Sequence, residues 1–153
     1  MILETTKSNI VSIKNIVISN KNCDQLIELY NYFGENKELN YEKFNNILKN
    51  IVQNNNHNIF LYLDNSNNIL GALTLLTEQK FIHNGKCVAH IEDFVVKKEY
   101  RSQNIGKDLM NYAINYAKQN NCYKIILDTN NKLVNYYTNY GFINKGIYMG
   151  YYF

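Results

Sequence analysis

The chain has 153 residues, 46% of them hydrophobic and 14% aromatic, which suits one domain over residues 1–153 with its own core. The net charge of +3 is small, so we expect a small polyanionic ligand rather than nucleic acid. The start of the chain has no long apolar run, and we expect neither a signal peptide nor a membrane span. Cys23, Cys87 and Cys122 form no metal or disulfide pattern, which favours buried thiols in a reducing, cytoplasmic compartment.

The N-terminal part of the chain is predicted to form one strand and two helices. A β-branched run at residues 10–19 favours the strand. Apolar residues at spacings of three and four predict amphipathic helices over residues 23–33 and 41–52. Gly34 is expected to end the first helix and Asn40 to cap the second.

The middle of the chain has the pattern of an antiparallel meander. Two apolar runs, residues 57–64 and 69–77, are joined by four polar residues and predict a hairpin. Residues 78–83 are expected to continue as an edge or arm. The pair Asn84 and Gly85 then predicts a turn into the next strand, over residues 88–96.

The C-terminal part is predicted to alternate helices and strands. We expect a helix over residues 105–118, a strand over 122–129, a short helix over 130–140 and a last strand over 142–153. A helix connects the strands at 88–96 and 122–129, so these two should lie parallel. The sequence therefore predicts a mixed α/β sheet that is splayed near this crossover.

The polar joint at residues 101–107, RSQNIGK, is a candidate anion site. The first amides of a helix have no partner within it, and the helix dipole adds partial positive charge there. Arg101 and Lys107 add formal charge beside it. One glycine, Gly106, fits neither the dinucleotide fingerprint nor the P-loop, so spacing alone leaves an ordinary strand–helix connection as the alternative.

This order of elements, with Arg101-x-x-Asn104-x-Gly106 at the joint, resembles the GNAT-type N-acetyltransferases. Within that superfamily, the chain from about residue 78 to 142 is similar to the glucosamine 6-phosphate N-acetyltransferases. The similar blocks are KFIH at 80–83, HIEDFVV at 90–96, GKDL at 106–109, CYKIILD at 122–128 and YYTNYGF at 136–142.

The resemblance implies a fold and a reaction. The fold is the acyl-CoA N-acyltransferase fold, a mixed and mostly antiparallel sheet with a parallel, splayed central pair and flanking helices. The reaction is direct attack of the glucosamine 6-phosphate amine on the thioester of acetyl-CoA, without a metal, which feeds UDP-N-acetylglucosamine synthesis. Family members form intertwined homodimers whose active sites use both chains, so a homodimer is implied.

The resemblance also implies roles for single residues. Asp128 orients the attacking amine, Tyr137 lies near the sulfur and protonates the thiolate, and Glu92 completes the catalytic set. Backbone groups of Phe94, Val95 and Val96 hold the acetyl group and the pantetheine arm, and the joint wraps the diphosphate. The donor-binding set also contains Arg101, Ser102, Gln103, Asn104, Ile105, Gly106, Lys107, Leu133 and Tyr137. The acceptor-binding set is Lys80, Phe81, Ile82, His83, Glu92, Asp93, Tyr123, Lys124 and Tyr152.

Each catalytic candidate has a structural alternative. Glu92 and Asp93 are neighbours on a strand and are expected to alternate faces, so at most one points at a given site. Asp128 is also placed to cap the helix over 130–140. Tyr137 is one of 14 tyrosines, for any of which core packing is the default.

Four departures from the family pattern leave other functions open. Asn104 replaces a glycine, Leu133 an asparagine, and Tyr152 an arginine that meets the sugar phosphate. The sequence at 33–36, FGEN, replaces a threonine-containing turn that also contacts this phosphate. The alternatives are acetyl transfer to a protein N-terminus, a lysine or a polyamine, and a catalytically silent acetyl-CoA-binding module.

Overall fold

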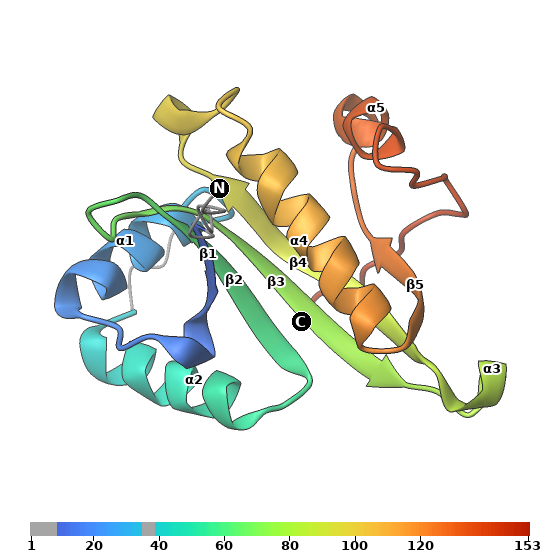
Figure 1. Cartoon of the computed structure of the whole chain (residues 1–153), viewed down its shortest axis with the longest axis horizontal. Helices are drawn as coiled ribbons and strands as arrows, with labels where there is room; N and C mark the ends of the chain where they lie inside the picture. The colour runs from blue at the N-terminus through green and yellow to red at the C-terminus, as the bar shows by residue number, and fades with distance from the viewer. Residues whose placement is uncertain (1–8, 35–38) are drawn as a thin grey trace, which may run out of the picture.

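One five-stranded sheet organises the chain, of which the structure, a computed structural model, describes residues 9–34 and 39–153 (Figure 1). The strands follow one another in chain order across the sheet, and each pair is antiparallel except the last, β4 with β5, which is parallel. This confirms the mixed sheet expected from the sequence. The strands are β1 (Ile10–Ser12), β2 (His57–Leu63), β3 (Ile69–Gln79), β4 (Cys87–Val96) and β5 (Cys122–Leu127).

The two N-terminal helices lie at the predicted positions, as α1 (Asn20–Tyr30) and α2 (Tyr41–Gln53). Asn40 caps α2 as expected, its side chain accepting a hydrogen bond from the Lys43 amide at 2.9 Å. α1 ends at Tyr30, so Gly34 is not its stop signal. The first strand is shorter than predicted, because Ser12 accepts a hydrogen bond from the Lys14 amide and begins a 3₁₀ turn, η1 (Ile13–Asn15).

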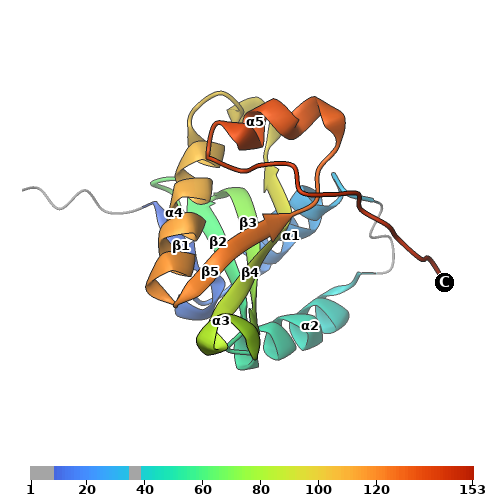
Figure 2. The same cartoon turned by 90° about the vertical axis from the view of Figure 1, so that its right-hand side faces the viewer.

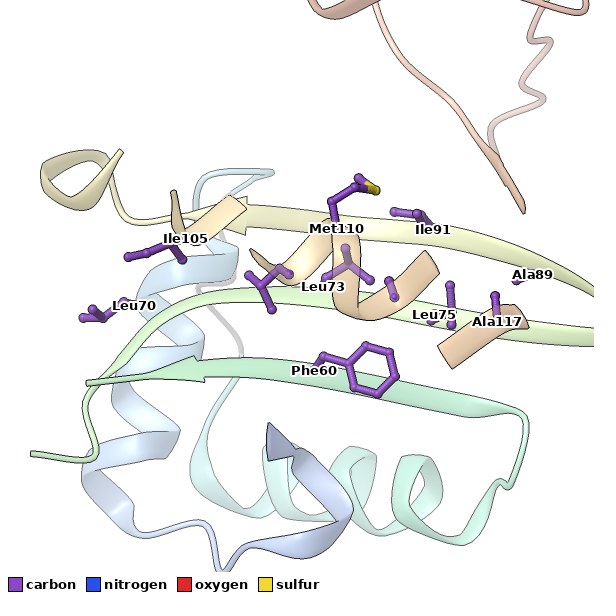
Figure 3. Packing of buried hydrophobic residues seen from close by; sticks show 11 residues of the cluster. Phe60, Leu70, Leu73, Leu75, Ala89, Ile91, Ile105, Met110 and Ala117 are labelled. Carbon is purple, nitrogen blue, oxygen red and sulfur yellow. The ribbon is translucent and has the colours of Figure 1, made fainter. Parts of the chain in front are cut away.

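Helices cover both faces of the sheet. α1 and α2 pack on one face, over a core that includes Leu29, Leu61 and Val95. On the other face, α4 (Ile105–Gln119) lies across the middle strands (Figure 3). α1 and α4 bury most of the apolar stripes from which they were predicted. On α2, Phe44 is buried, whereas Ile47 and Val52 of the predicted stripe are exposed. The residues labelled in Figure 3 are Phe60, Leu70, Leu73, Leu75, Ala89, Ile91, Ile105, Met110 and Ala117.

Gly71 of β3 lets α4 approach the sheet closely. A Cβ atom at this position would lie 3.2 Å from Ile105 and 3.2 Å from Leu109, both on α4, and 3.1 Å from the Val95 carbonyl oxygen. Ile105, the first residue of α4, is 3% exposed. The start of α4 is therefore fixed against β3 by side-chain packing. In the described ranges, no helix has the length and apolar character needed to cross a bilayer.

The arm between β3 and β4 forms a short helical turn, α3 (Ile82–Gly85). His83 and Asn84 have φ angles of 54° and 57°, and Gly85 has 72°. Three successive left-handed residues reverse the chain, so the turn predicted at Asn84 and Gly85 is present. Phe81 and Ile82 beside it are exposed.

The C-terminal segment differs from the prediction. A 3₁₀ turn, η3 (Asn131–Leu133), leads into α5 (Val134–Thr138), but residues 142–153 form no strand, although they all lie in the described part of the chain. A β-branched and aromatic sequence forms a strand only when it pairs with another, and this segment runs outward from the sheet (Figure 2). The parallel pair β4–β5 consequently lies at the sheet edge. The large side chains exposed here are Ile143, Ile147, Tyr148, Met149, Tyr151, Tyr152 and Phe153.

Candidate active site

The parallel strands β4 and β5 part before β4 ends. Their pairing runs from Cys87–Cys122 to Ile91–Leu127. Beyond this point β4 continues to Val96, whereas the chain leaves β5 at Asp128. The two strands diverge toward the end of the sheet where α4 begins (Figure 1). The main chain of β4 from residue 92 onward is therefore not paired with β5, and an extended ligand can hydrogen-bond to it there.

A β-bulge interrupts β4 at this fork. Glu92 is opposite Thr74 and Val95 opposite Ala72, so β4 has one residue more than β3 in this interval. Asp93 takes a φ of 46°, as the extra residue of a bulge often departs from extended geometry. Glu92 and Asp93 are both exposed, and the bulge interrupts the regular alternation of faces that the sequence predicted for this strand.

Three carboxylates lie near the fork. Although the Glu92 residue is exposed, its carboxyl is partly shielded from water, which raises its pKa, and the charges of Asp128 and Asp93 raise it further. Asp128 follows Leu127, the residue paired with Ile91, so it comes directly beside the point where the strands part. Asn130, rather than Asp128, caps η3, by accepting a hydrogen bond from the Lys132 amide at 3.0 Å. The helix-cap alternative for Asp128 is therefore not adopted.

The raised pKa of Glu92 leads us to predict how the stability of the folded chain depends on pH. Because the folded state disfavours its ionised form, the contribution of Glu92 to stability falls as the pH rises through the interval between its unfolded and folded pKa values. Glu92→Gln should therefore increase Tm more at about pH 7 than below about pH 4, where the carboxyl is largely protonated in both states. Thermal unfolding at the two pH values measures this. An equal change in Tm at both would contradict it, and Asp128→Asn should shrink the difference.

The start of α4 presents main-chain amides. The first hydrogen bond within the helix runs from the Asp108 amide to the Asn104 carbonyl, at 2.9 Å. The amides of Ile105, Gly106 and Lys107 precede it, and no side chain in the described part of the chain caps the helix. Unpaired amides and the helix dipole together favour an anion. The anion site predicted from the sequence is therefore structurally suitable.

Asn104 supports this geometry in a left-handed conformation, with φ 65° and ψ 0°. Asparagine adopts this region more easily than other residues with a Cβ atom. Asn104→Val should destabilise the folded chain by about 1–2 kcal/mol, because a β-branched residue strains there. Asn104→Gly, the matched control, should leave the free energy of unfolding unchanged or raise it. Denaturant titration compares the three proteins, and equal stabilities for the valine and glycine variants would contradict the expectation.

Arg101 is held beside this site by two contacts. Its Nε donates a hydrogen bond to the Val96 carbonyl at 3.2 Å. Its guanidinium lies 5.8 Å from the ring centre of Tyr32, and the Lys98 ammonium lies 5.3 Å from the same ring. Cations are attracted to aromatic faces at such distances. Tyr32, just beyond α1, thus holds the positively charged groups of Lys98 and Arg101 near the end of β4.

Tyrosines of α5 line the other side of the fork. Tyr137 is half-buried, with ring centres 6.0 Å from Phe142 and 5.2 Å from Tyr136. Burial, and then Tyr140, raise the pKa of Tyr137, so its hydroxyl keeps its proton at neutral pH. Tyr136 lies 6.3 Å from Phe94 of β4, measured between ring centres. Leu133, before α5, is exposed.

The predicted acceptor residues divide into two groups. Glu92 and Asp93 are at the fork. The members at residues 80–83, between β3 and β4, and on β5 lie at the opposite end of the sheet (Figure 1), where His83 stacks on Tyr123 at 4.1 Å and Lys124 lies 5.5 Å from the same ring. Asp128 is the fourth residue after Lys124, which corresponds to roughly 13 Å of extended chain. One chain therefore does not bring Lys80, Phe81, Ile82, His83, Tyr123 and Lys124 to the fork.

Tyr152 is also apart from the fork. It is 85% exposed, and its ring folds back on Gly150, within 3.0–3.1 Å of where a Cβ would be. Lys80 contacts Glu78, which also pairs with His90 at 3.3 Å. These acceptor-side residues thus have local partners within their own segments.

Sequence reasoning did not single out three tyrosines near the fork. Tyr30 of α1 lies close enough to Asp93 for that charge, after burial, to raise its pKa. Tyr32 supports Arg101, and Tyr136 contacts Phe94. The sequence carries no signal that distinguishes them from the other tyrosines, because all three contacts join segments that are far apart along the chain.

Comparison with known proteins agrees with this geometry. The sequence profile of the Acetyltransferase (GNAT) family matches residues 21–142. The chain therefore belongs to the GNAT family of acetyltransferases, whose members transfer an acetyl group from acetyl-CoA to an amine. The fold class and the resemblance found in the sequence are confirmed.

Within this family, the chain is similar to proteins named for one acceptor. It is 38% identical to glucosamine 6-phosphate N-acetyltransferase 1 of Dictyostelium discoideum, over 76% of this chain and 73% of the other. It is 39% identical to a probable glucosamine 6-phosphate N-acetyltransferase 2 of Oryza sativa subsp. japonica, over 56% of this chain. This second match spans about half of the rice protein, 51%.

Solved structures show the same relationship. The crystal structure of glucosamine-6-phosphate N-acetyltransferase from Arabidopsis thaliana superimposes with a TM-score of 0.83 at 27% identity, covering 94% of this chain and 98% of that one. An acetyltransferase from Trypanosoma brucei gives a TM-score of 0.81 at 25% identity, with 94% and 99% coverage. The similarity thus extends over nearly the whole of both known structures.

Proposed function

We propose that this chain transfers the acetyl group of acetyl-CoA to the amine of glucosamine 6-phosphate. The products are coenzyme A and N-acetylglucosamine 6-phosphate, a precursor of UDP-N-acetylglucosamine. The observation that carries the proposal is the fork between β4 and β5 beside the uncapped start of α4, in a chain similar to proteins that bear this activity in their names. We further propose that residues 1–153 act as a single domain in the cytoplasm.

The donor side is supported by main-chain groups. We propose that the diphosphate accepts hydrogen bonds from amides of residues 103–107, which include the unpaired first amides of α4, and that Arg101 and Lys107 supply charge. Phe94, Val95 and Val96, beyond the last β4–β5 pair, offer backbone groups to the pantetheine arm and to the acetyl oxygen. In the proposed donor site these join Ser102, Gln103, Asn104, Ile105, Gly106, Leu133 and Tyr137.

The chemical step requires orientation of the amine and stabilisation of the leaving thiolate. Asp128 and Glu92 are placed to hold the amine at the fork, and the raised pKa of Glu92 suits it to take up the proton that the amine loses. Tyr137 keeps its proton at neutral pH. It therefore donates a proton to the thiolate as the carbon–sulfur bond breaks.

The acceptor site is proposed to form in a homodimer. The acceptor residues at 80–83, between β3 and β4, and on β5 do not reach the fork of their own chain. The apolar segment 142–153 is exposed and unpaired with the described strands. A second copy can pair with this segment, cover it and bring its own residues to the fork. The partner-dependent set is Lys80, Phe81, Ile82, His83, Tyr123, Lys124 and Tyr152, beside Glu92 and Asp93.

The dimer leads to a direct prediction. A chain ending at Phe142 should sediment as a monomer and lose turnover, while it keeps a cooperative thermal transition because the segment makes little of the core. Analytical ultracentrifugation of both lengths tests this. A full-length monomer with full activity would reject the shared site.

A thiol-release assay tests the function. With acetyl-CoA as donor, glucosamine 6-phosphate should be acetylated far faster than unphosphorylated glucosamine, spermidine or a peptide amine. Mass spectrometry of the sugar product identifies the new amide. Equal rates for all amines would reject this acceptor, and tight binding of acetyl-CoA with no turnover on any amine would indicate a silent binding module.

A second acceptor class is favoured by one observation. The family resemblance implies an arginine for the sugar phosphate at the position of Tyr152, and a threonine-containing turn where this chain has Phe33 and Gly34. Transfer to a protein N-terminus, a lysine or a polyamine would not need these contacts. A preference for spermidine or peptide in the same assay would select this function.

A further inference from the structure

The hydroxyl of Tyr136 lies over the start of α4. Gly106 is the second residue of that helix, and a Cβ atom there would be 3.0 Å from the Tyr136 oxygen and 3.3 Å from Cζ of Phe94. Figures 1 and 2 both place α5 at the end of α4 where that helix begins. The Tyr136 hydroxyl thus adjoins the same unpaired amides that form the anion site.

The hydrogen bond from the Tyr140 hydroxyl leaves the proton of Tyr136 free to be donated to another group. Tyr140 donates a hydrogen bond to the Tyr136 oxygen at 3.3 Å, and within the described ranges this is the one hydrogen bond that either hydroxyl makes. A phenol that accepts from a neighbour still has its own proton to donate. Burial raises the pKa of Tyr136, so this proton is retained at neutral pH.

Ring contacts fix the position of this donor. Tyr136 makes edge contacts with Tyr137 at 5.2 Å and with Tyr140 at 5.3 Å, and it lies beside Phe94. Tyr136 and Tyr137 are successive residues of a helix, so their side chains point about 100° apart. The Tyr136 side chain is directed to the start of α4, while the Tyr137 side chain packs against Phe142.

We infer that Tyr136, held by Tyr140, donates a hydrogen bond to the diphosphate of the acyl donor. Donor binding then uses a side chain from α5 as well as the amides of α4. Tyr136 binds the diphosphate, and the neighbouring Tyr137 acts at the sulfur. The inference rests on the proposed binding of acetyl-CoA at this joint.

Calorimetry with coenzyme A tests the inference. Tyr136→Phe removes the hydroxyl and keeps the ring, so Kd for coenzyme A should rise about tenfold, as for loss of a hydrogen bond to a charged group. Tyr140→Phe should raise Kd by a smaller factor, because Tyr136 is then less well fixed. Tyr112→Phe is the matched control, since Tyr112 lies elsewhere on α4 and packs on Phe60 at 4.8 Å, and its Kd should equal that of the unaltered chain.

A donor without a diphosphate separates the two proposals. S-acetylpantetheine keeps the thioester and the arm, and its Kd should be the same for the unaltered chain and for Tyr136→Phe. An unchanged Kd for coenzyme A in Tyr136→Phe would overturn the inference. An equal loss of affinity for coenzyme A and for S-acetylpantetheine would also overturn it, because it would indicate a packing role. Failure of the unaltered chain to bind coenzyme A would instead overturn the proposed function.

Discussion

Replacing Tyr137 by phenylalanine is expected to lower kcat by about 10²–10⁴-fold, the range for loss of a positioned proton donor. The ring contacts with Phe142 and Tyr136 remain, so the fold and Kd for acetyl-CoA should hardly change. The substitution removes only the hydroxyl that we propose protonates the departing thiolate. Single-turnover kinetics, which follow the chemical step alone, measure the loss.

Two comparisons separate this role from packing. Tyr112→Phe removes a hydroxyl from a tyrosine remote from the fork and should keep full activity. A donor whose thiol has a lower pKa should partly restore the rate of Tyr137→Phe, because its thiolate needs less protonation. Full activity of Tyr137→Phe with acetyl-CoA would remove Tyr137 from the mechanism.

The second large effect is expected at Asp128. Asp128→Asn should lower kcat/KM for the amine acceptor by about 10²-fold, as for loss of a positioned carboxylate, with little change in Kd for acetyl-CoA. Asp128 is exposed and caps no helix, so Tm should be preserved. Steady-state kinetics at varied acceptor concentration, together with thermal unfolding, measure both quantities.

The pH profile of Asp128→Asn gives an independent readout. The charge of Asp128 contributes to the raised pKa of Glu92, so its removal should move any kinetic pKa that belongs to Glu92 downward. Asp128→Asn with an unchanged rate and an unchanged profile would exclude Asp128 from the site. A lower rate with an unchanged profile would assign the general base to a group other than Glu92.

Local patterns predicted most of the fold. The three-to-four spacing of apolar residues located α4, and the polar tetrapeptide after Leu63 and Asp64 located the hairpin of β2 and β3. Both patterns act between neighbours in the chain, so one sequence contains them. The tertiary features escaped prediction: the bulge at Asp93 depends on pairing with β3, and the segment 142–153 needs a partner strand.

The candidate site shows the same division. Asn104 takes a left-handed conformation that its residue type permits, so this local feature depends on the residue itself. The contact of Arg101 with Tyr32 and that of Tyr136 with Gly106 join residues that are far apart along the chain. The distance between Lys124 and the fork is likewise a property of the sheet. Such contacts leave no periodic signal, and only the folded chain reveals them.

The close approach of α4 to β3 at Gly71 has a consequence for substitutions at position 71 of this chain. Ile105 packs the first turn of α4 against Gly71 of β3. The next residue, Gly106, has one of the unpaired amides of the proposed anion site. A methyl group added at Gly71 would lift that turn from the sheet and misalign the amides, although position 71 touches no ligand. Gly71→Ala is therefore expected to weaken donor binding as well as stability, and a measurement of stability alone would miss the first effect.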